Sequence, residues 1–96
     1  MKYAAHIYLW TKIWADREVG LFARAKALGM DLLEISIGDD ILFDVALTNR
    51  AAKDAGMEIV IGPGGLWPEG ADLSDDDPAN RKIALDWHRQ QIDLAV

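Results

Sequence analysis

Two segments of the chain carry one pattern, Leu28-Gly29-Met30-Asp31-Leu32-Leu33-Glu34-Ile35 and Ala55-Gly56-Met57-Glu58-Ile59-Val60-Ile61. Each runs from a helix end through glycine, methionine and an acidic residue into an apolar strand. Gly29 and Gly56 are 27 positions apart, the length of one strand–helix unit. A repeat at this spacing indicates tandem supersecondary units, and strands alternating with helices favour a parallel sheet with right-handed crossovers.

The rest of the chain extends this alternation to three strands and three helices. We expect strands over about residues 3–8, 31–37 and 57–61, and helices over about residues 16–28, 44–55 and from about 77 to the end. The second strand is apolar on both faces apart from Glu34 and Ser36, as is typical of a buried parallel strand. Asp77 before Pro78 is a strong start for the last helix, with Ser74 as a competing cap.

The predicted fold class is therefore α/β, of the (β/α) TIM-barrel family, with residues 1–96 forming a partial barrel of three βα units. A complete barrel takes about 250 residues, so the remaining strands are expected outside this chain. Open edges on the first and third strands would favour self-association, and a homo-oligomer is expected. Residues 62–73 form a loop rich in glycine and proline.

Composition excludes several classes of protein. Ten Lys and Arg against sixteen Asp and Glu give a formal net charge of −6, which argues against a nucleic-acid partner. No apolar run approaches the roughly 20 residues of a membrane span, and the N-terminus lacks the features of a signal peptide. The absence of cysteine excludes disulfides and thiolate sites, and a cytoplasmic protein is the default expectation.

Barrel active sites lie at the carboxyl ends of the strands, and this rule selects the segments 6–14, 34–40 and 62–67. In the first, His6 is either a hydrogen-bond partner of a ligand or a core histidine. Tyr8, Trp10 and Trp14 either stack on a sugar ring or pack the barrel mouth. Glu34 holds a hydroxyl, a lysine or arginine side chain, or a water, or else forms a structural ion pair. The glycines from Gly62 onward allow a close backbone approach or form a simple turn.

No metal site can be assembled from the spacing of ligands in this segment. His6 and His88 are far apart, and no H-x-x-E-H or H-E-x-x-H pattern occurs. The acidic run Asp75-Asp76-Asp77 is interpreted as a solvated helix start favoured by the helix dipole.

Three elements together resemble a known family. They are Tyr8-x-Trp10-x-x-x-Trp14, the segment from Leu28 to Ile35, and Asp72-Leu73-Ser74 before a helix that carries Arg81. This pattern looks like the opening of D-tagatose 3-epimerases and D-psicose (allulose) 3-epimerases, of the xylose isomerase-like sugar isomerase/epimerase family. The resemblance runs over essentially the whole chain but covers about the first third of such an enzyme.

The resemblance implies an often oligomeric enzyme that binds a ketose sugar or sugar phosphate through a divalent metal, manganese, magnesium or cobalt. Two glutamates would move the proton next to the carbonyl. It implies that these glutamates and the metal ligands lie on later strands, so that no catalytic or metal-binding residue falls in this chain. It places Trp14 on an aromatic substrate wall, His6 where the family usually has Phe or Tyr, and Gly62 at a small residue facing the sugar.

Two departures leave alternatives open. His6 replaces an aromatic residue, and the stretch from Gly64 to Pro68 is not the family's usual loop, so another sugar-phosphate isomerase of the superfamily fits as well. A non-enzymatic barrel fragment that self-associates or binds a ligand is the competing class. Coding sequence continuing past Val96 would favour the enzyme, and on its own the 96-residue chain is expected to be inactive.

Overall fold

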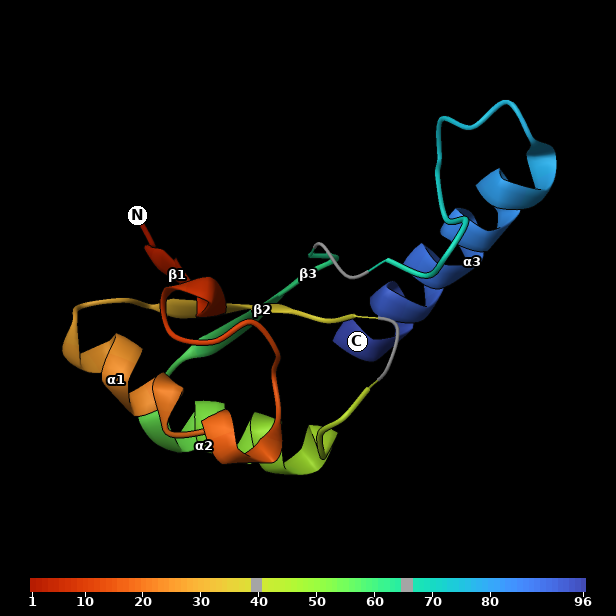
Figure 1. Ribbon diagram of the computed structural model, residues 1–96. Helices are drawn as coiled ribbons and strands as arrows, with labels where there is room; N and C mark the ends of the chain where they lie inside the picture. The colour runs from red at the N-terminus through yellow and green to blue at the C-terminus, as the bar shows by residue number, and fades with distance from the viewer. Residues whose placement is uncertain (39–40, 65–66) are drawn as a thin grey trace.

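The computed structural model describes residues 1–38, 41–64 and 67–96. Its elements, in chain order, are β1 (Ala4–His6), the 3-10 helices η1 (Ile7–Leu9) and η2 (Asp16–Glu18), α1 (Leu21–Ala27), β2 (Leu32–Ser36), α2 (Val45–Ala55), β3 (Glu58–Gly62) and α3 (Pro78–Ala95) (Figure 1). The predicted alternation of strands and helices is confirmed. Asp39, Asp40, Gly65 and Leu66, which belong to two of the segments predicted to carry a site, lie outside the described residues.

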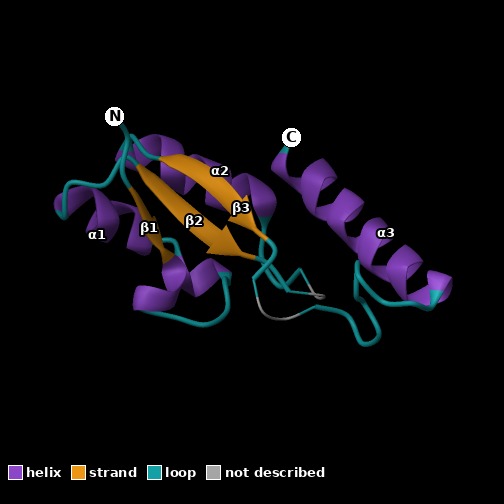
Figure 2. Cartoon of the chain, turned by 90° about the horizontal axis from the view of Figure 1, so that it is seen from above, coloured by secondary structure: helices purple, strands orange, loops and turns teal. Residues whose placement is uncertain are grey.

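The three strands form one parallel sheet in the order β1-β2-β3 (Figure 2). Ala5 pairs with Leu33 and His6 with Glu34. Glu34 pairs in turn with Val60. The predicted α/β class and the parallel pairing are thus confirmed, with neighbouring strands adjacent in the sequence as right-handed βα units require.

One face of this sheet is apolar and is covered by helices. Leu33 and Ile35 of β2 are completely buried on it, together with Ala5 of β1. α1 and α2 lie side by side across this face (Figures 1 and 2). Because side chains alternate along a strand, the residues between these apolar ones project from the opposite face, which we call the open face.

The repeated glycines end the first two helices as expected. Gly29 follows α1 with a φ of 88°, and Gly56 caps α2 with a φ of 66°, a left-handed conformation that costs glycine little. At the other end of α2, the Asp44 carboxylate accepts the N–H of Leu47 at 3.0 Å. Each helix therefore stops where the chain turns back toward the next strand.

The first βα unit differs from the prediction in two places. The strand predicted over residues 3–8 ends at His6, because the His6 ring accepts the N–H of Tyr8 at 3.0 Å and caps η1. The helix predicted over residues 16–28 begins with a separate 3-10 turn, and α1 starts only after Gly20. Glycine at this point lowers the helix propensity where the two pieces meet.

The acidic run Asp75-Asp76-Asp77 stabilises the start of α3. Asp77 is the N-cap and accepts the N–H of Ala79 at 2.8 Å, with Pro78 in the first turn. The competing cap Ser74 instead donates to Asp72 at 2.7 Å. The Asp77 N–H and the Asn80 amide donate to Asp75 and hold the pKa of its carboxyl below the usual value. These contacts support the interpretation of the run as a helix start.

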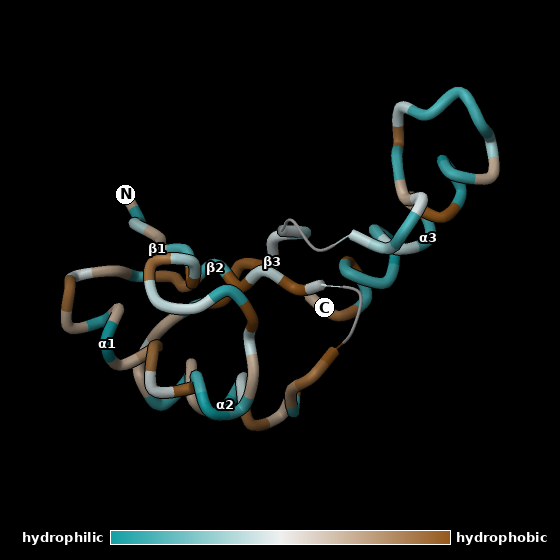
Figure 3. Tube along the Cα trace, in the orientation of Figure 1, coloured by the Kyte–Doolittle hydropathy of each residue, from teal (hydrophilic) through white to brown (hydrophobic). Residues whose placement is uncertain are grey.

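α3 meets the sheet mainly through its C-terminal end and otherwise extends past it (Figure 1). Leu94 packs against the core on the side of α2, whereas Ile83, Leu85 and Ile92 remain exposed. Hydrophobic and hydrophilic residues alternate along this helix (Figure 3). Within the residues that the structure describes, no helix is long and apolar enough to span a bilayer.

Trp14 belongs to the core. Its side chain is 2% exposed and meets Phe22 of α1 edge to face at 5.4 Å between ring centroids. Its indole N–H donates to the Thr48 hydroxyl of α2 at 3.0 Å, in a buried position. Thr48 is buried, whereas Val45 on the same helix is 38% exposed. Trp14 therefore joins the loop after β1 to both helices.

We expect Thr48→Val to destabilise the chain by about 1–3 kcal/mol, because it leaves a buried indole N–H without an acceptor. Urea unfolding of Thr48→Val, Trp14→Phe and the double variant measures this as a coupling free energy. Trp14→Ala should cost more, about 3–5 kcal/mol. A Thr48→Val variant as stable as the parent chain would contradict the proposed role of this hydrogen bond.

Gln91 of α3 allows a second prediction about stability. Its side-chain oxygen is buried without a hydrogen-bond partner in the described residues. Replacing an unsatisfied buried acceptor by an apolar group of similar size is neutral or stabilising. We therefore expect Gln91→Leu to keep or raise the urea midpoint. Gln90→Leu, on the exposed neighbour, is the matched control and should change stability by less than about 0.5 kcal/mol. A clear loss of stability in Gln91→Leu alone would show that the amide has a partner.

Candidate functional site

The candidate site lies at the carboxyl edge of the sheet, on the open face. Parallel strands bring their carboxyl ends to one edge, and this edge is where α/β proteins bind ligands. β1 ends here with His6, β2 with Glu34 and Ser36, and β3 with Gly62. The pairing register places His6 opposite Glu34 and Ser36 opposite Gly62. Three of the four predicted site residues, His6, Glu34 and Gly62, therefore come together.

His6 connects the first strand to the second. Its Nε2 lies 2.9 Å from the Ser36 hydroxyl oxygen, and its Nδ1 accepts the backbone N–H of Tyr8 at 3.0 Å. The Tyr8 ring lies against the imidazole, with 4.2 Å between centroids. His6 is half-buried and Ser36 is 6% exposed. The histidine is thus a bonded member of a polar cluster on the open face.

Gly62 leaves room for the carboxylate of Glu34. A β-carbon at position 62 would lie 2.7 Å from Oε1 of Glu34, closer than nonbonded atoms approach. Any larger side chain there would displace this carboxylate. The small residue that the sequence placed at the end of the third strand therefore clears space for an acidic side chain.

Glu34 itself makes no ion pair or hydrogen bond with any residue in the described part of the chain. The structural ion pair that the sequence left open is thus not seen among these residues. A carboxylate accepts several hydrogen bonds. Glu34 can therefore accept from hydroxyl groups that approach the open face.

Gly64 plays a similar part for two hydroxyl groups. A β-carbon built there would lie 3.0 Å from the hydroxyl oxygens of Ser36 and Tyr8. Its φ of 55° also favours glycine. The Trp67 indole N–H donates to the Gly64 carbonyl at 2.8 Å, and the Trp67 ring contacts Trp87 and His88 of α3. The backbone of Gly64 is thus tied to the last helix.

Ser36, Tyr8 and Gly64 complete the cluster, although neither Ser36 nor Gly64 was singled out from the sequence as a site residue. Ser36 could have been found, because it lies two positions after Glu34 and period-two alternation puts both on one face. Tyr8 stood out only as one of several aromatic residues. Gly64 was visible as part of a glycine-rich loop, but nothing in its sequence position indicates which side chains it faces.

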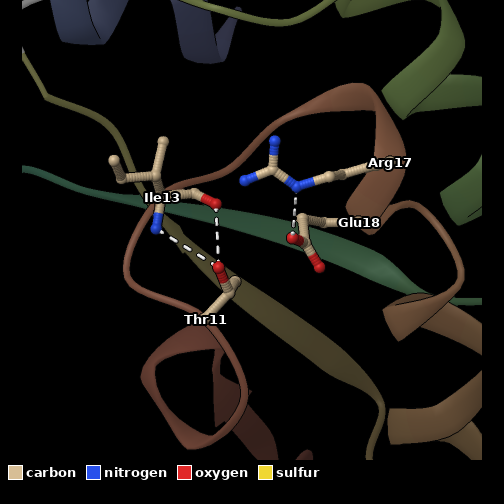
Figure 4. Close-up of polar contacts among 4 residues, drawn as sticks. All are labelled: Thr11, Ile13, Arg17 and Glu18. Carbon is tan, nitrogen blue, oxygen red and sulfur yellow. Dashed lines mark hydrogen bonds and ion pairs between the residues drawn. The ribbon is translucent and has the colours of Figure 1, made fainter.

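The two tryptophans after β1 are not part of this cluster. Trp14 is in the core, so the structure gives it the packing role, and its place on a substrate wall stays a prediction. Trp10 lies under the Arg24 guanidinium, 5.7 Å from the ring centroid. In the loop between the two tryptophans, the Thr11 hydroxyl donates to the carbonyl of Ile13 at 3.1 Å and accepts the N–H of Ile13 at 3.4 Å (Figure 4). This turn leads the chain from the open face into the core.

Among residues 1–38, 41–64 and 67–96, no three His, Cys, Asp or Glu side chains are placed to hold a metal ion. A pocket lies between α2 and the C-terminal end of α3, lined largely by apolar residues that include Ile35 and Ile61. It is on the helix-covered side of the sheet, away from the polar cluster.

No protein-family model matches the chain, and no curated protein matches it. Among solved structures, the chain is similar to an N-terminally His-tagged D-allulose 3-epimerase from Methylomonas sp., crystallised in complex with D-allulose. The TM-score is 0.82 at 24% sequence identity, and the match covers 98% of this chain and 32% of that chain. The chain thus has the fold of about a third of that enzyme. The expected resemblance is confirmed at the level of the fold.

Proposed function

We propose that this chain supplies the first three βα units of a (β/α) barrel that epimerises a ketose sugar at the carbon next to the carbonyl. The observation that carries the proposal is the fold shared with D-allulose 3-epimerase over 98% of the chain. The polar cluster at the carboxyl edge supports it, because this edge is where barrel enzymes bind their substrates.

The chemistry of the cluster suits a polyol. His6, Ser36 and Glu34 offer hydrogen-bond donors and acceptors at one end of the open face. Sugar hydroxyls act both as donors and as acceptors, and such a mixed set of groups matches them. None of the cluster residues is Lys or Arg, and Glu34 would repel a phosphate. These charges favour an unphosphorylated sugar over a sugar phosphate.

A divalent metal, manganese, magnesium or cobalt, is proposed for the complete enzyme as Lewis acid at the ketose oxygens. The described residues of this chain do not provide a metal site. We therefore assign the metal ligands and the two proton-transferring glutamates to other strands of the barrel. The part assigned to this chain is to bind and orient the sugar.

The open edges and the last helix support the proposal of a barrel. In the described residues, β1 and β3 each pair on one side only. The apolar side chains Ile83, Leu85 and Ile92 of α3 are exposed, and such surface is normally covered by further elements. A second candidate is a non-enzymatic fragment that self-associates through these same surfaces. Sedimentation of the purified chain would detect such an oligomer.

We expect D-allulose to shift amide resonances of His6, Glu34, Ser36 and Gly62 in a titration of the ¹⁵N-labelled chain. Gly62→Ala should weaken this binding, because its methyl group displaces the Glu34 carboxylate. Gly20→Ala is the matched control, since a β-carbon there meets no atom within 4 Å.

Shifts that cluster around the pocket on the helix side would contradict this location of the site. The same holds if Gly62→Ala and Gly20→Ala bind D-allulose equally well while both keep the parent fold. A titration without any shift would favour the non-enzymatic candidate.

We further expect the 96-residue chain to convert neither D-fructose nor D-tagatose when manganese, magnesium or cobalt is added. The physical reason is that the metal ligands and both proton-transferring groups are assigned to other strands. Product analysis by chromatography after long incubation measures this. Metal-dependent conversion by the purified chain would overturn that assignment while supporting the activity.

A further inference from the structure

The hydrogen bonds around His6 have a direction. The backbone N–H of Tyr8 can only donate, so Nδ1 of His6 must accept and carries no hydrogen. The neutral ring then bears its hydrogen on Nε2, which lies 2.9 Å from the Ser36 oxygen. Nε2 therefore donates to Ser36, and the Ser36 hydroxyl hydrogen must point to another acceptor.

Among the described residues, the Ser36 hydroxyl makes no hydrogen bond besides the one with His6, so its hydrogen is left for an acceptor on the open face. The Ser36 side chain is on the open face, 6% exposed, with Gly64 on one side. Because Gly64 has no side chain, the hydroxyls of Ser36 and Tyr8 can approach its backbone closely. A buried hydroxyl hydrogen without a partner needs an acceptor.

We propose that His6 is a positioning residue, held as the Nε2–H tautomer by Tyr8, which turns Ser36 into a hydrogen-bond donor toward an oxygen atom of the bound ligand. The identification of that ligand as a sugar rests on the proposed function. Ser36 then selects a hydroxyl or carbonyl oxygen at this point of the site. Glu34, on the same strand and face, can only accept while it is ionised, so the two residues recognise opposite partners.

His88 provides an internal reference for the tautomer. Its Nδ1 lies 2.7 Å from the carbonyl oxygen of Ala84. A carbonyl only accepts, so in His88 the hydrogen must be on Nδ1. The two histidines of this chain are thus expected to be opposite tautomers. One ¹H–¹⁵N spectrum of the ring nitrogens can distinguish them, and a His88→Gln variant assigns the signals.

The test combines this spectrum with D-allulose titrations at a pH where both histidines are neutral. We expect the Nε2–H pattern for His6 in the parent chain, and the same pattern in Ser36→Ala, because Tyr8 sets the tautomer. We expect Ser36→Ala to bind D-allulose about fivefold more weakly, the effect of one lost hydrogen bond. Ser74→Ala, on an exposed serine bonded to Asp72, is the matched control and should bind as the parent does.

A third variant separates capping from positioning. Asparagine at position 6 can still accept the Tyr8 N–H through an Asx turn, but it is too short to reach Ser36. His6→Asn should therefore fold and yet bind D-allulose more weakly than the parent chain.

The outcomes are distinct. An Nδ1–H tautomer at His6 would overturn the proposal, as would affinities for D-allulose that are equal in the parent chain, Ser36→Ala and His6→Asn. An Nε2–H tautomer without any D-allulose binding by the parent chain would instead overturn the sugar as ligand, and with it the proposed function, while the tautomer result upholds the positioning of Ser36 by His6.

Discussion

Leu33 and Ile35 of β2 are completely buried between the sheet and its helices, and this burial determines the side on which every other residue of the sheet lies. Because side chains alternate along a strand, it turns Glu34 and Ser36 to the open face. A shift of pairing by one residue would reverse the two sets. Burying a carboxylate among apolar side chains costs far more than any local preference could return, so the register is strongly determined.

The same register makes the glycines at the end of β3 necessary. Ser36 pairs with Gly62, and the Glu34 carboxylate lies over Gly62. The polar side chains of β2 therefore occupy the space that side chains at positions 62 and 64 would fill. Residues 26 or more positions apart in the sequence thus limit each other's side-chain size, because they are neighbours on adjacent strands.

Much of this arrangement could be predicted from the sequence, and the limits have a physical reason. The repeat around Gly29 and Gly56 predicted the βα units, and the alternation in β2 predicted that Glu34 departs from the apolar face. Contacts between distant residues could not be predicted, because they depend on register and helix placement. The bond from Trp14 to Thr48 spans 34 positions, and that from His6 to Ser36 spans 30. A tryptophan beside a strand end is compatible with a ligand site and with the core, and only its hydrogen-bond partner distinguishes them.

α3 influences the site although only its C-terminal end packs against the sheet. The Trp67 ring lies against Trp87 and His88 of this helix, while its indole N–H holds the Gly64 carbonyl. Gly64 in turn faces Ser36 and Tyr8. A displacement of α3 would therefore also shift the backbone of Gly64, which borders the polar cluster. Trp87 is buried, whereas Trp67 is exposed and His88 is partly buried. Each ring contact is worth about 0.5–1.5 kcal/mol beyond burial, so the contacts together hold the loop against the helix. Elements that cover α3 would strengthen this hold, and the shape of the open face would then depend on how the last helix is packed.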